Sequence, residues 1–324
     1  MHISEAFDVI KDDIRKTEDL FRKNVASDVY LITKMGEYIL DSGGKRLRPL
    51  VLLLSGRLCG YGGSSHIPLA VVVEFIHTAT LLHDDVVDNA NLRRGRSSAN
   101  SVWGNGSSVL AGDYLLAKAF SLAVESKDSR VLKVLAETTT RMAEGEMLQL
   151  IKHSDVNTTE GEYLDVITSK TAVLFSASCR MAAILSGAAE GKEKALSDFG
   201  LDIGIAYQLV DDCLDYTSKD EELGKRAGND LREGKVTLPF IKAYSGASGK
   251  EKDIMRKAIE AGHATKDQLL EVFEIIKKHR GIEYTTAFAG ERIEEAKRHL
   301  EVFEPTTDRA ALTAVADNVI ERTY

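Results

Sequence analysis

Six aspartates stand in two copies of one spacing, Asp-Asp-x-x-Asp. The copies are Asp84, Asp85 and Asp88, and Asp211, Asp212 and Asp215. On a helix, the first and last aspartate of each copy lie four residues apart on one face, where like charges repel. Mg²⁺ is usually coordinated by one or two such carboxylates together with phosphate oxygens of the substrate. A single copy would more simply be a solvated acidic helix end, but the repeated spacing predicts a shared magnesium site.

Basic residues gather in short segments around these acidic motifs. The segments are Lys45-Arg46-Leu47-Arg48 after Gly43-Gly44, Arg93-Arg94 after the first motif, Lys170-Thr171, and Lys225 and Lys235 after the second motif. Arg and Lys clusters and helix N-termini bind phosphate oxygens. The aspartates could bind metal ions and the basic residues a polyanion, and both kinds of residue are set in apolar sequence. This combination predicts a substrate with a diphosphate head and a hydrocarbon tail.

The composition of the chain excludes several classes of protein. Of 324 residues 44% are apolar, enough for a large core, and a net charge of −8 argues against nucleic acid as a partner. Three cysteines, odd in number and embedded in apolar sequence, indicate buried thiols in a reducing compartment. We see no signal peptide and no apolar run near the roughly 20 residues of a membrane span. We therefore expect a cytoplasmic protein without a membrane span.

Helical periodicity dominates, and no proline falls between Pro68 and Pro239, which permits long helices there. Strand signals are poor, because no stretch sustains period-2 alternation between turns. The helices are expected near residues 3–24, 27–42, 47–59, 68–89, 97–103, 107–125, 128–152, 159–168, 170–188, 191–217, 234–243, 249–260, 265–279, 281–301 and 307–322. We predict an all-α fold, one domain over residues 1–324, with long helices around a central apolar cavity.

Taken together, the motifs resemble the signatures of the trans-isoprenyl (polyprenyl) diphosphate synthases. The matching segments run in order from about residue 35 to 245 and include Gly43-Gly44-Lys45-Arg46-x-Arg48-Pro49, both aspartate motifs, Tyr207-Gln208, and Gly234-Lys235-x-Thr237-Leu238-Pro239. Residues 74–88 and 93–105 look most like the long-chain, octaprenyl-type branch. Departures are small: Arg226-Ala227 stands where many relatives carry other small residues or Pro, and residues 321–324 only loosely resemble the family's terminal basic group.

The resemblance implies the isoprenoid synthase fold, a homodimer and specific ligands. Isopentenyl diphosphate would be held by Lys45, Arg48, His77 and Arg94. The allylic diphosphate would be held by Arg93, Lys170, Thr171, Gln208, Lys225 and Lys235, and three Mg²⁺ ions would bridge it to the two aspartate motifs. Lys170 and Lys235 would join the aspartates as catalytic residues. His77 lies two turns before Asp84 on the same helix face, which favours a ligand over a core histidine.

This chemistry would lengthen an allylic diphosphate, expected to be farnesyl diphosphate, by repeated head-to-tail condensation with isopentenyl diphosphate. Residues five and four before Asp84, Ala79 and Thr80, would set the product length. Bulky aromatic residues there stop growth early in the family, whereas these two are small. We therefore expect a long all-trans product, octaprenyl (C40), destined for quinone side chains.

Four alternatives stay open. A synthase of shorter products (C15 to C25) would share every motif. A silent subunit of a heteromeric synthase usually loses one aspartate motif, and this chain keeps both. A terpene cyclase would not be expected to keep the Lys45 and Arg48 site or the second motif. A purely structural helical bundle would have no reason to pair acids and bases.

Overall fold

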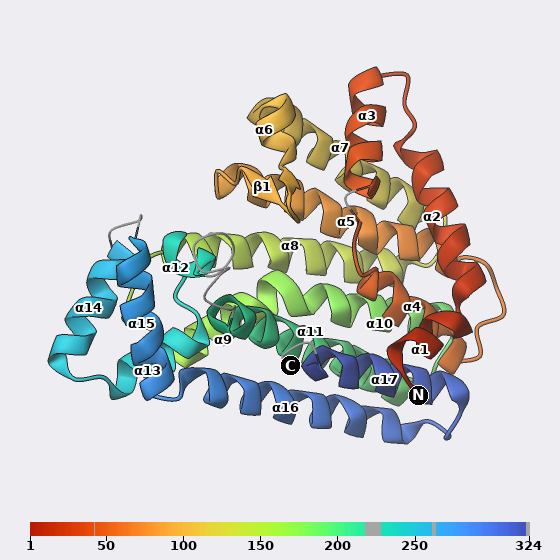
Figure 1. The fold of residues 1–324 in the computed structure, drawn as a ribbon. Coiled ribbons are helices and arrows are strands. Elements are labelled where there is room, and N and C mark those ends of the chain that lie inside the picture. Colours follow the sequence, from red (N-terminus) through yellow and green to blue (C-terminus); the bar gives the residue numbers. More distant parts are fainter. Residues whose placement is uncertain (42, 218–227, 261–263, 322–324) are drawn as a thin grey trace. The chain divides into compact units, whose positions relative to one another are not determined.

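The computed structural model describes residues 1–41, 43–217, 228–260 and 264–321, and most of these are helical (Figure 1), which confirms the all-α prediction. The α-helices are α1 (Ile3–Val9), α2 (Lys11–Val25), α3 (Tyr30–Asp41), α4 (Leu47–Leu58), α5 (His66–Val87), α6 (Ala99–Trp103), α7 (Asn105–Val124), α8 (Ser129–Ile151), α9 (Glu160–Ile167), α10 (Val173–Leu185), α11 (Glu190–Thr217), α12 (Asn229–Arg232), α13 (Leu238–Gly246), α14 (Gly249–Glu260), α15 (Lys266–Lys278), α16 (Gly281–His299) and α17 (Thr307–Glu321). A π-helical turn (Thr168–Ala172) joins α9 to α10, and a 3-10 turn (Leu300–Val302) follows α16. In the described chain, strands occur only in the antiparallel pair β1 (Leu92–Arg93) and β2 (Arg96–Ser97).

The chain divides into two compact units. Unit 1 comprises Met1–Thr139, Leu174–Ser197 and Val302–Val315, and unit 2 comprises Thr140–Val173, Asp198–Glu301 and Ala316–Tyr324. The first aspartate motif therefore belongs to unit 1 and the second to unit 2. A single domain over residues 1–324 stays a prediction.

Helix α5, which carries the first aspartate motif at its end, is the central buried helix of unit 1. Most of its apolar residues are fully buried, and it packs against α2, α4 and along α7. Gly112 permits the close approach of α7, since a Cβ there would lie 2.3 Å from Nε2 of His83. The same His83 nitrogen lies 3.2 Å from the carbonyl oxygen of Val109. Helix α7 thus fixes the end of α5 from which the aspartates project.

By length and composition, α5 and α7 could each cross a membrane. The expectation that no segment approaches a span was therefore too strong. Core helices of soluble proteins pass the same test, and 67% of the most apolar stretch of α5 is buried in the fold, against 39% for α7. Two such helices are weak support for a membrane span.

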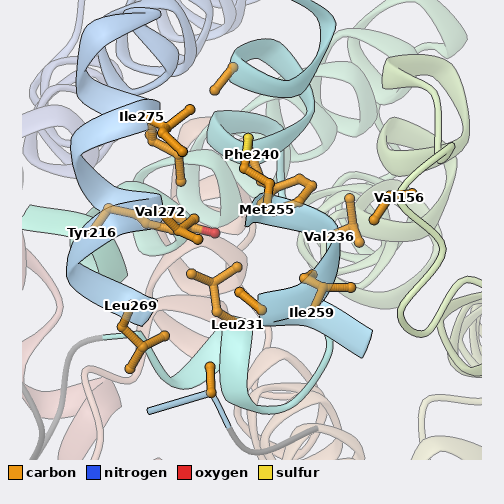
Figure 2. Packing of buried hydrophobic residues seen from close by; sticks show 14 residues of the cluster. Val156, Tyr216, Leu231, Val236, Phe240, Met255, Ile259, Leu269, Val272 and Ile275 are labelled. Atoms are coloured by element: carbon orange, nitrogen blue, oxygen red, sulfur yellow. The ribbon is translucent and has the colours of Figure 1, made fainter. Parts of the chain in front are cut away.

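A hydrophobic cluster stabilises the part of unit 2 that follows the second aspartate motif (Figure 2). Leu269 and Val272 lie three residues apart on one face of α15 and belong to the same cluster as Met255 and Ile259 of α14. The apolar spacing of α15 follows the helical period, and Thr265 and Gln268 form a capping box at its start. The cluster also takes in Tyr216, Leu231 and Phe240, so it joins the end of α11 to α12 and α13.

Most predicted helices occur near their expected bounds, with three instructive differences. The predicted helix 3–24 is broken at Ile10, whose side chain is buried. The predicted helix 234–243 begins later, at Leu238, because Thr237 has an extended backbone at the N-cap position and Pro239 suits a first helical turn. The hairpin of β1 and β2 was not predicted, and its two turn residues, Arg94 and Gly95, both have positive φ.

Candidate functional site

In unit 1, the basic loop that ends at Arg48 is anchored to α5 by a buried ion pair. The guanidinium of Arg46 binds the carboxylate of Glu74, whose side chain is only 8% exposed. Arg46 adopts the left-handed conformation, with φ of 50°, just before α4 begins. Because Glu74 lies one turn before His77, the pair fixes the loop beside that histidine.

The predicted isopentenyl diphosphate ligands converge around His77. Burial, together with the positive charges of Arg48 and Arg94, lowers the pKa of His77 well below its ordinary value. Arg48 lies over the ring of Phe175, 4.4 Å from its centroid, and Arg94 donates a hydrogen bond to the carbonyl oxygen of Gly43. A neutral imidazole among guanidinium groups is a setting that favours an incoming anion. Lys45, on the same loop, is exposed.

The three aspartates of the first motif have different surroundings. Helix α5 ends at Val87, so Asp88 is its C-cap, and Asp84 and Asp88 are half-buried. Asp85 is buried, and its Oδ1 accepts a hydrogen bond from Nε of Arg93 at 2.7 Å, while Nη2 of the same guanidinium lies 2.7 Å from that oxygen as an ion pair. The structure thus places Arg93, predicted to hold the allylic diphosphate, against a predicted metal ligand.

In unit 2, both carboxylate oxygens of the buried Asp212 have protein partners. The hydroxyl of Tyr163 donates to Oδ2 at 2.5 Å, and Nε2 of Gln208 donates to Oδ1 at 2.8 Å. Gln208 also accepts a hydrogen bond from Oγ1 of Thr171 at 3.0 Å. One chain of hydrogen bonds therefore connects Thr171 to Asp212, whereas Asp211 is exposed.

Acidic groups accumulate around the second motif. The carboxylate of Asp215 accepts hydrogen bonds from the backbone N–H groups of Asn229 and Asp230, both at 3.1 Å, at the start of α12. Burial raises the pKa of Asp215, and burial followed by the charges of Asp215 and Asp212 raises that of Asp230 well above its usual range. Burial also raises the pKa of Asp212 to about 7. This side of unit 2 therefore concentrates negative charge that a cation would stabilise.

The predicted lysine ligands are paired with glutamates that the sequence did not single out. Lys170 Nζ lies 2.6 Å from Glu146 of α8, and Lys235 Nζ lies 2.7 Å from Glu233. The spacing of Glu146 carries no signal, because its partner is 24 residues away in the sequence. Tyr163 was missed for the same reason. Lys225, also predicted, lies outside the described residues.

The acidic side chains suit a hard divalent cation shared with a substrate. Across the described ranges, no three His, Cys, Asp or Glu side chains meet closely enough to hold a metal ion unaided. Mg²⁺ commonly takes only one or two carboxylates and completes its shell with phosphate oxygens and water. The raised pKa of Asp212 marks an electrostatic cost that such an ion would remove. The residues therefore fit a metal that arrives with a phosphorylated ligand.

Comparison with known proteins extends the resemblance beyond the motifs. Residues 29–276 match the polyprenyl synthetase family. The chain is 41% identical to octaprenyl diphosphate synthase of Haemophilus influenzae, over 100% of this chain and 98% of that protein. A decaprenyl diphosphate synthase from Rhodobacter capsulatus has a TM-score of 0.94 and 41% identity, over 99% of both chains. A polyprenyl synthase from Caulobacter crescentus CB15, complexed with calcium and isoprenyl diphosphate, has a TM-score of 0.95 and 39% identity, over 99% of this chain and 98% of that one.

The burial of Asp212 predicts a pH dependence of stability without metal. Its pKa is about 7 in the folded protein against 3.8 ordinarily, so between these values the folded chain keeps a proton that the unfolded chain has released. Stability must then fall as the pH rises. We expect the free energy of unfolding to fall by about 1–3 kcal/mol more in wild type than in Asp212→Asn between about pH 5 and pH 7.

Urea unfolding in the presence of EDTA measures this difference. Asp165→Asn, on the exposed side of α9, is the control and should follow the wild type. Equal pH dependence in wild type and Asp212→Asn would show that Asp212 ionises at its ordinary pKa.

Proposed function

The chain belongs to the polyprenyl synthetase family and is a trans-polyprenyl diphosphate synthase, and we propose that it elongates farnesyl diphosphate by successive condensations with isopentenyl diphosphate. The proposed product is octaprenyl diphosphate (C40), used for quinone side chains. The observation that carries the proposal is the difference in charge between two sets of residues, with arginines around a neutral His77 in unit 1 and carboxylates around Asp212 in unit 2. Such an arrangement suits two diphosphates with different roles.

Isopentenyl diphosphate is the proposed ligand of Lys45, Arg48, His77 and Arg94. This diphosphate does not leave during the reaction, so it needs cations that hold it and no metal that activates it. The stacking of Arg48 on Phe175 and the Arg46–Glu74 ion pair support the proposal, because both restrict the basic loop before the substrate arrives. A neutral His77 can donate a hydrogen bond to a phosphate oxygen without adding charge.

The allylic diphosphate is the proposed ligand of a second set: Arg93, Lys170, Thr171, Gln208, Lys225 and Lys235. The proposed metal ligands are Asp84, Asp85, Asp88, Asp211, Asp212 and Asp215, for three Mg²⁺ ions. When bound, Mg²⁺ would neutralise charge that develops on the leaving diphosphate. Lys170, Lys235 and Arg93 now contact Glu146, Glu233 and Asp85, so substrate binding exchanges these carboxylates for phosphate oxygens.

Each cycle breaks the allylic C–O bond and one C–H bond of isopentenyl diphosphate and makes one C–C bond, and the electron pair of the C–H bond forms the new allylic double bond. The allylic C1–O bond breaks, and its electron pair departs with the diphosphate, whose charge Lys170, Lys235 and Arg93 stabilise. The double bond of isopentenyl diphosphate attacks C1 and forms the new C–C bond. A proton is then lost to the released diphosphate. Apolar side chains must keep water away from the allylic cation, since water would end elongation.

Small residues beneath the first aspartate motif support a long product. Ala79 is 2% exposed, and the hydroxyl of Thr80 is turned back to the carbonyl oxygen of His77 at 2.8 Å. Neither side chain carries the bulk that would stop a growing chain one helical turn below Asp84. The two relatives at 41% identity are named for octaprenyl and decaprenyl products, so identity alone does not choose the length.

We further propose that the protein is a cytoplasmic homodimer. In this proposal it does not bind nucleic acid and has no segment that spans a membrane. Exposed apolar side chains on α7 and α8 support this assembly, among them Leu110 (70% exposed) and Ile151 (68% exposed). Burying such residues against a second copy would remove apolar surface from water.

Removing one aspartate from either motif should abolish elongation without unfolding the protein. We expect Asp84→Ala and Asp211→Ala each to lower kcat by about 100-fold or more, because each loses a proposed ligand of the metal that would stabilise charge on the leaving diphosphate. Incorporation of labelled isopentenyl diphosphate, with Mg²⁺ and farnesyl diphosphate, measures the rate. Asp165→Ala should keep it, and a normal rate in either motif variant would refute the metal site.

Filling the position below Asp84 should shorten the product. We expect Ala79→Phe to end elongation at least one isoprene unit earlier than the wild type, whose products should end near C40. Chromatography of the dephosphorylated products measures the chain length. Ala310→Phe, at an exposed position of α17, should leave the length unchanged. Products of equal length from Ala79→Phe and wild type would show that the growing chain runs elsewhere.

A further inference from the structure

The segment that carries Lys170 and Thr171 is a π-helical turn, Thr168–Ala172, between α9 and α10. A π-helical turn accommodates an extra residue by widening the helix. Such turns are rare in proteins, and those that occur are often found at functional sites. It persists only where its neighbours leave room for it on each side. In unit 2 those neighbours are α8 and α11, and each presents a glycine to the turn.

On the α8 side, the neighbour is Gly145. A Cβ at this position would lie 2.8 Å from the backbone nitrogen of Lys170 and 2.9 Å from the carbonyl carbon of Ser169. Both distances are below 3.0 Å, and Cβ atoms in folded proteins essentially never approach other atoms that closely. Any side chain other than hydrogen at residue 145 would therefore displace the backbone of Lys170.

On the α11 side, the neighbour is Gly204. A Cβ there would lie 2.5 Å from Cα of Ala172 and 2.9 Å from its Cβ. Some helical glycines are not constrained in this way: a Cβ at Gly161 would meet nothing within 4 Å, and at the buried Gly56 the nearest atom lies at 3.9 Å. Tight contacts also occur elsewhere, as at Gly112, but among the described glycines Gly145 and Gly204 are the two whose Cβ would meet the π-helical turn.

Each of these glycines is accompanied by a polar side chain that reaches the turn. Glu146 directly follows Gly145, and its carboxylate lies 2.6 Å from Nζ of Lys170. Gln208 follows Gly204 by one helical turn on the same face, and it accepts the hydrogen bond of Thr171 at 3.0 Å. The approach that the glycines permit is what brings these partners within reach.

We propose that Gly145 and Gly204 form a glycine clamp, a pair of positioning residues that hold the π-helical turn so that Lys170 and Thr171 meet the allylic diphosphate. The inference rests on the proposed function, which makes Lys170 and Thr171 ligands of that substrate. Neither glycine nor Glu146 touches the substrate in this account. Their effect is geometric, and a misplacement of about 1 Å at a reacting group costs on the order of 100-fold in rate.

The experiment compares Gly145→Ala and Gly204→Ala with two controls, Gly56→Ala at a buried helical position and Gly161→Ala at an exposed one. Steady-state kinetics would give separate KM values for farnesyl diphosphate and isopentenyl diphosphate. In both clamp variants we expect the KM for farnesyl diphosphate to rise tenfold or more, with the KM for isopentenyl diphosphate within twofold of wild type. The controls should match wild type in both values.

A KM that rises for one substrate only is not what general loss of structure produces, since unfolding lowers the amount of active enzyme and leaves KM unchanged. If one alanine variant does not fold, the other still tests the clamp, because Gly145 and Gly204 contact the turn from different helices. An unchanged value in the folded variants, or equal rises for both substrates, would overturn the clamp.

Lys170→Ala separates this inference from the proposed function. If Lys170→Ala raises the KM for farnesyl diphosphate and the glycine variants do not, the clamp is refuted while the substrate assignment stands. If Lys170→Ala leaves that KM unchanged, the assignment of Lys170 to the allylic diphosphate is refuted, and the clamp with it.

Discussion

The crowding of carboxylates around the buried Asp212 is the constraint on which the functional part of unit 2 depends. Burial is the main cause that raises the pKa values of Asp212 and Asp230, and the charge of Asp215 raises both further. Isolated buried charges are costly, so each needs partners. Tyr163 and Gln208 satisfy Asp212, and the start of α12 satisfies Asp215. Lys235 and Arg232 lower the pKa values of Asp230 and Asp215 in part, but burial still raises both, which leaves a remaining electrostatic cost for a cation to offset.

Unit 1 presents the opposite charge by equally special local geometry. Three guanidinium groups lie near His77, and a local feature positions each of them. Arg46 has a left-handed backbone, Arg94 lies in a tight turn, and Arg48 packs over the ring of Phe175. The π-helical turn at Lys170 serves the same purpose in unit 2. Uncommon backbone conformations thus occur where charged groups must be presented, while regular helices, packed as in the α14 and α15 cluster, supply the stability that permits them.

Sequence patterns predicted the parts of this account that are local. The aspartate spacing, the basic segments and most helices were evident, because each depends on residues within one or two helical turns. Glu146, Tyr163 and Glu74 were not evident, since each contacts a partner 24 or more residues away. The turn at Arg94 lacks the Asn or Asp that usually marks it. The π-helical turn has no sequence signature: residues 168 and 170–172 were predicted as parts of two ordinary helices, with a break only at residue 169.

The most direct test of the central claim is whether metal and diphosphate stabilise the protein together. Melting temperature would be measured with Mg²⁺ alone, farnesyl diphosphate alone and both, without isopentenyl diphosphate. In this account the aspartates bind Mg²⁺, the basic residues bind the diphosphate, and the diphosphate completes the ligand shell of the metal. The two ligands together should therefore raise the melting temperature by more than the sum of their separate effects. No rise with both, or the full rise with Mg²⁺ alone, would contradict the account.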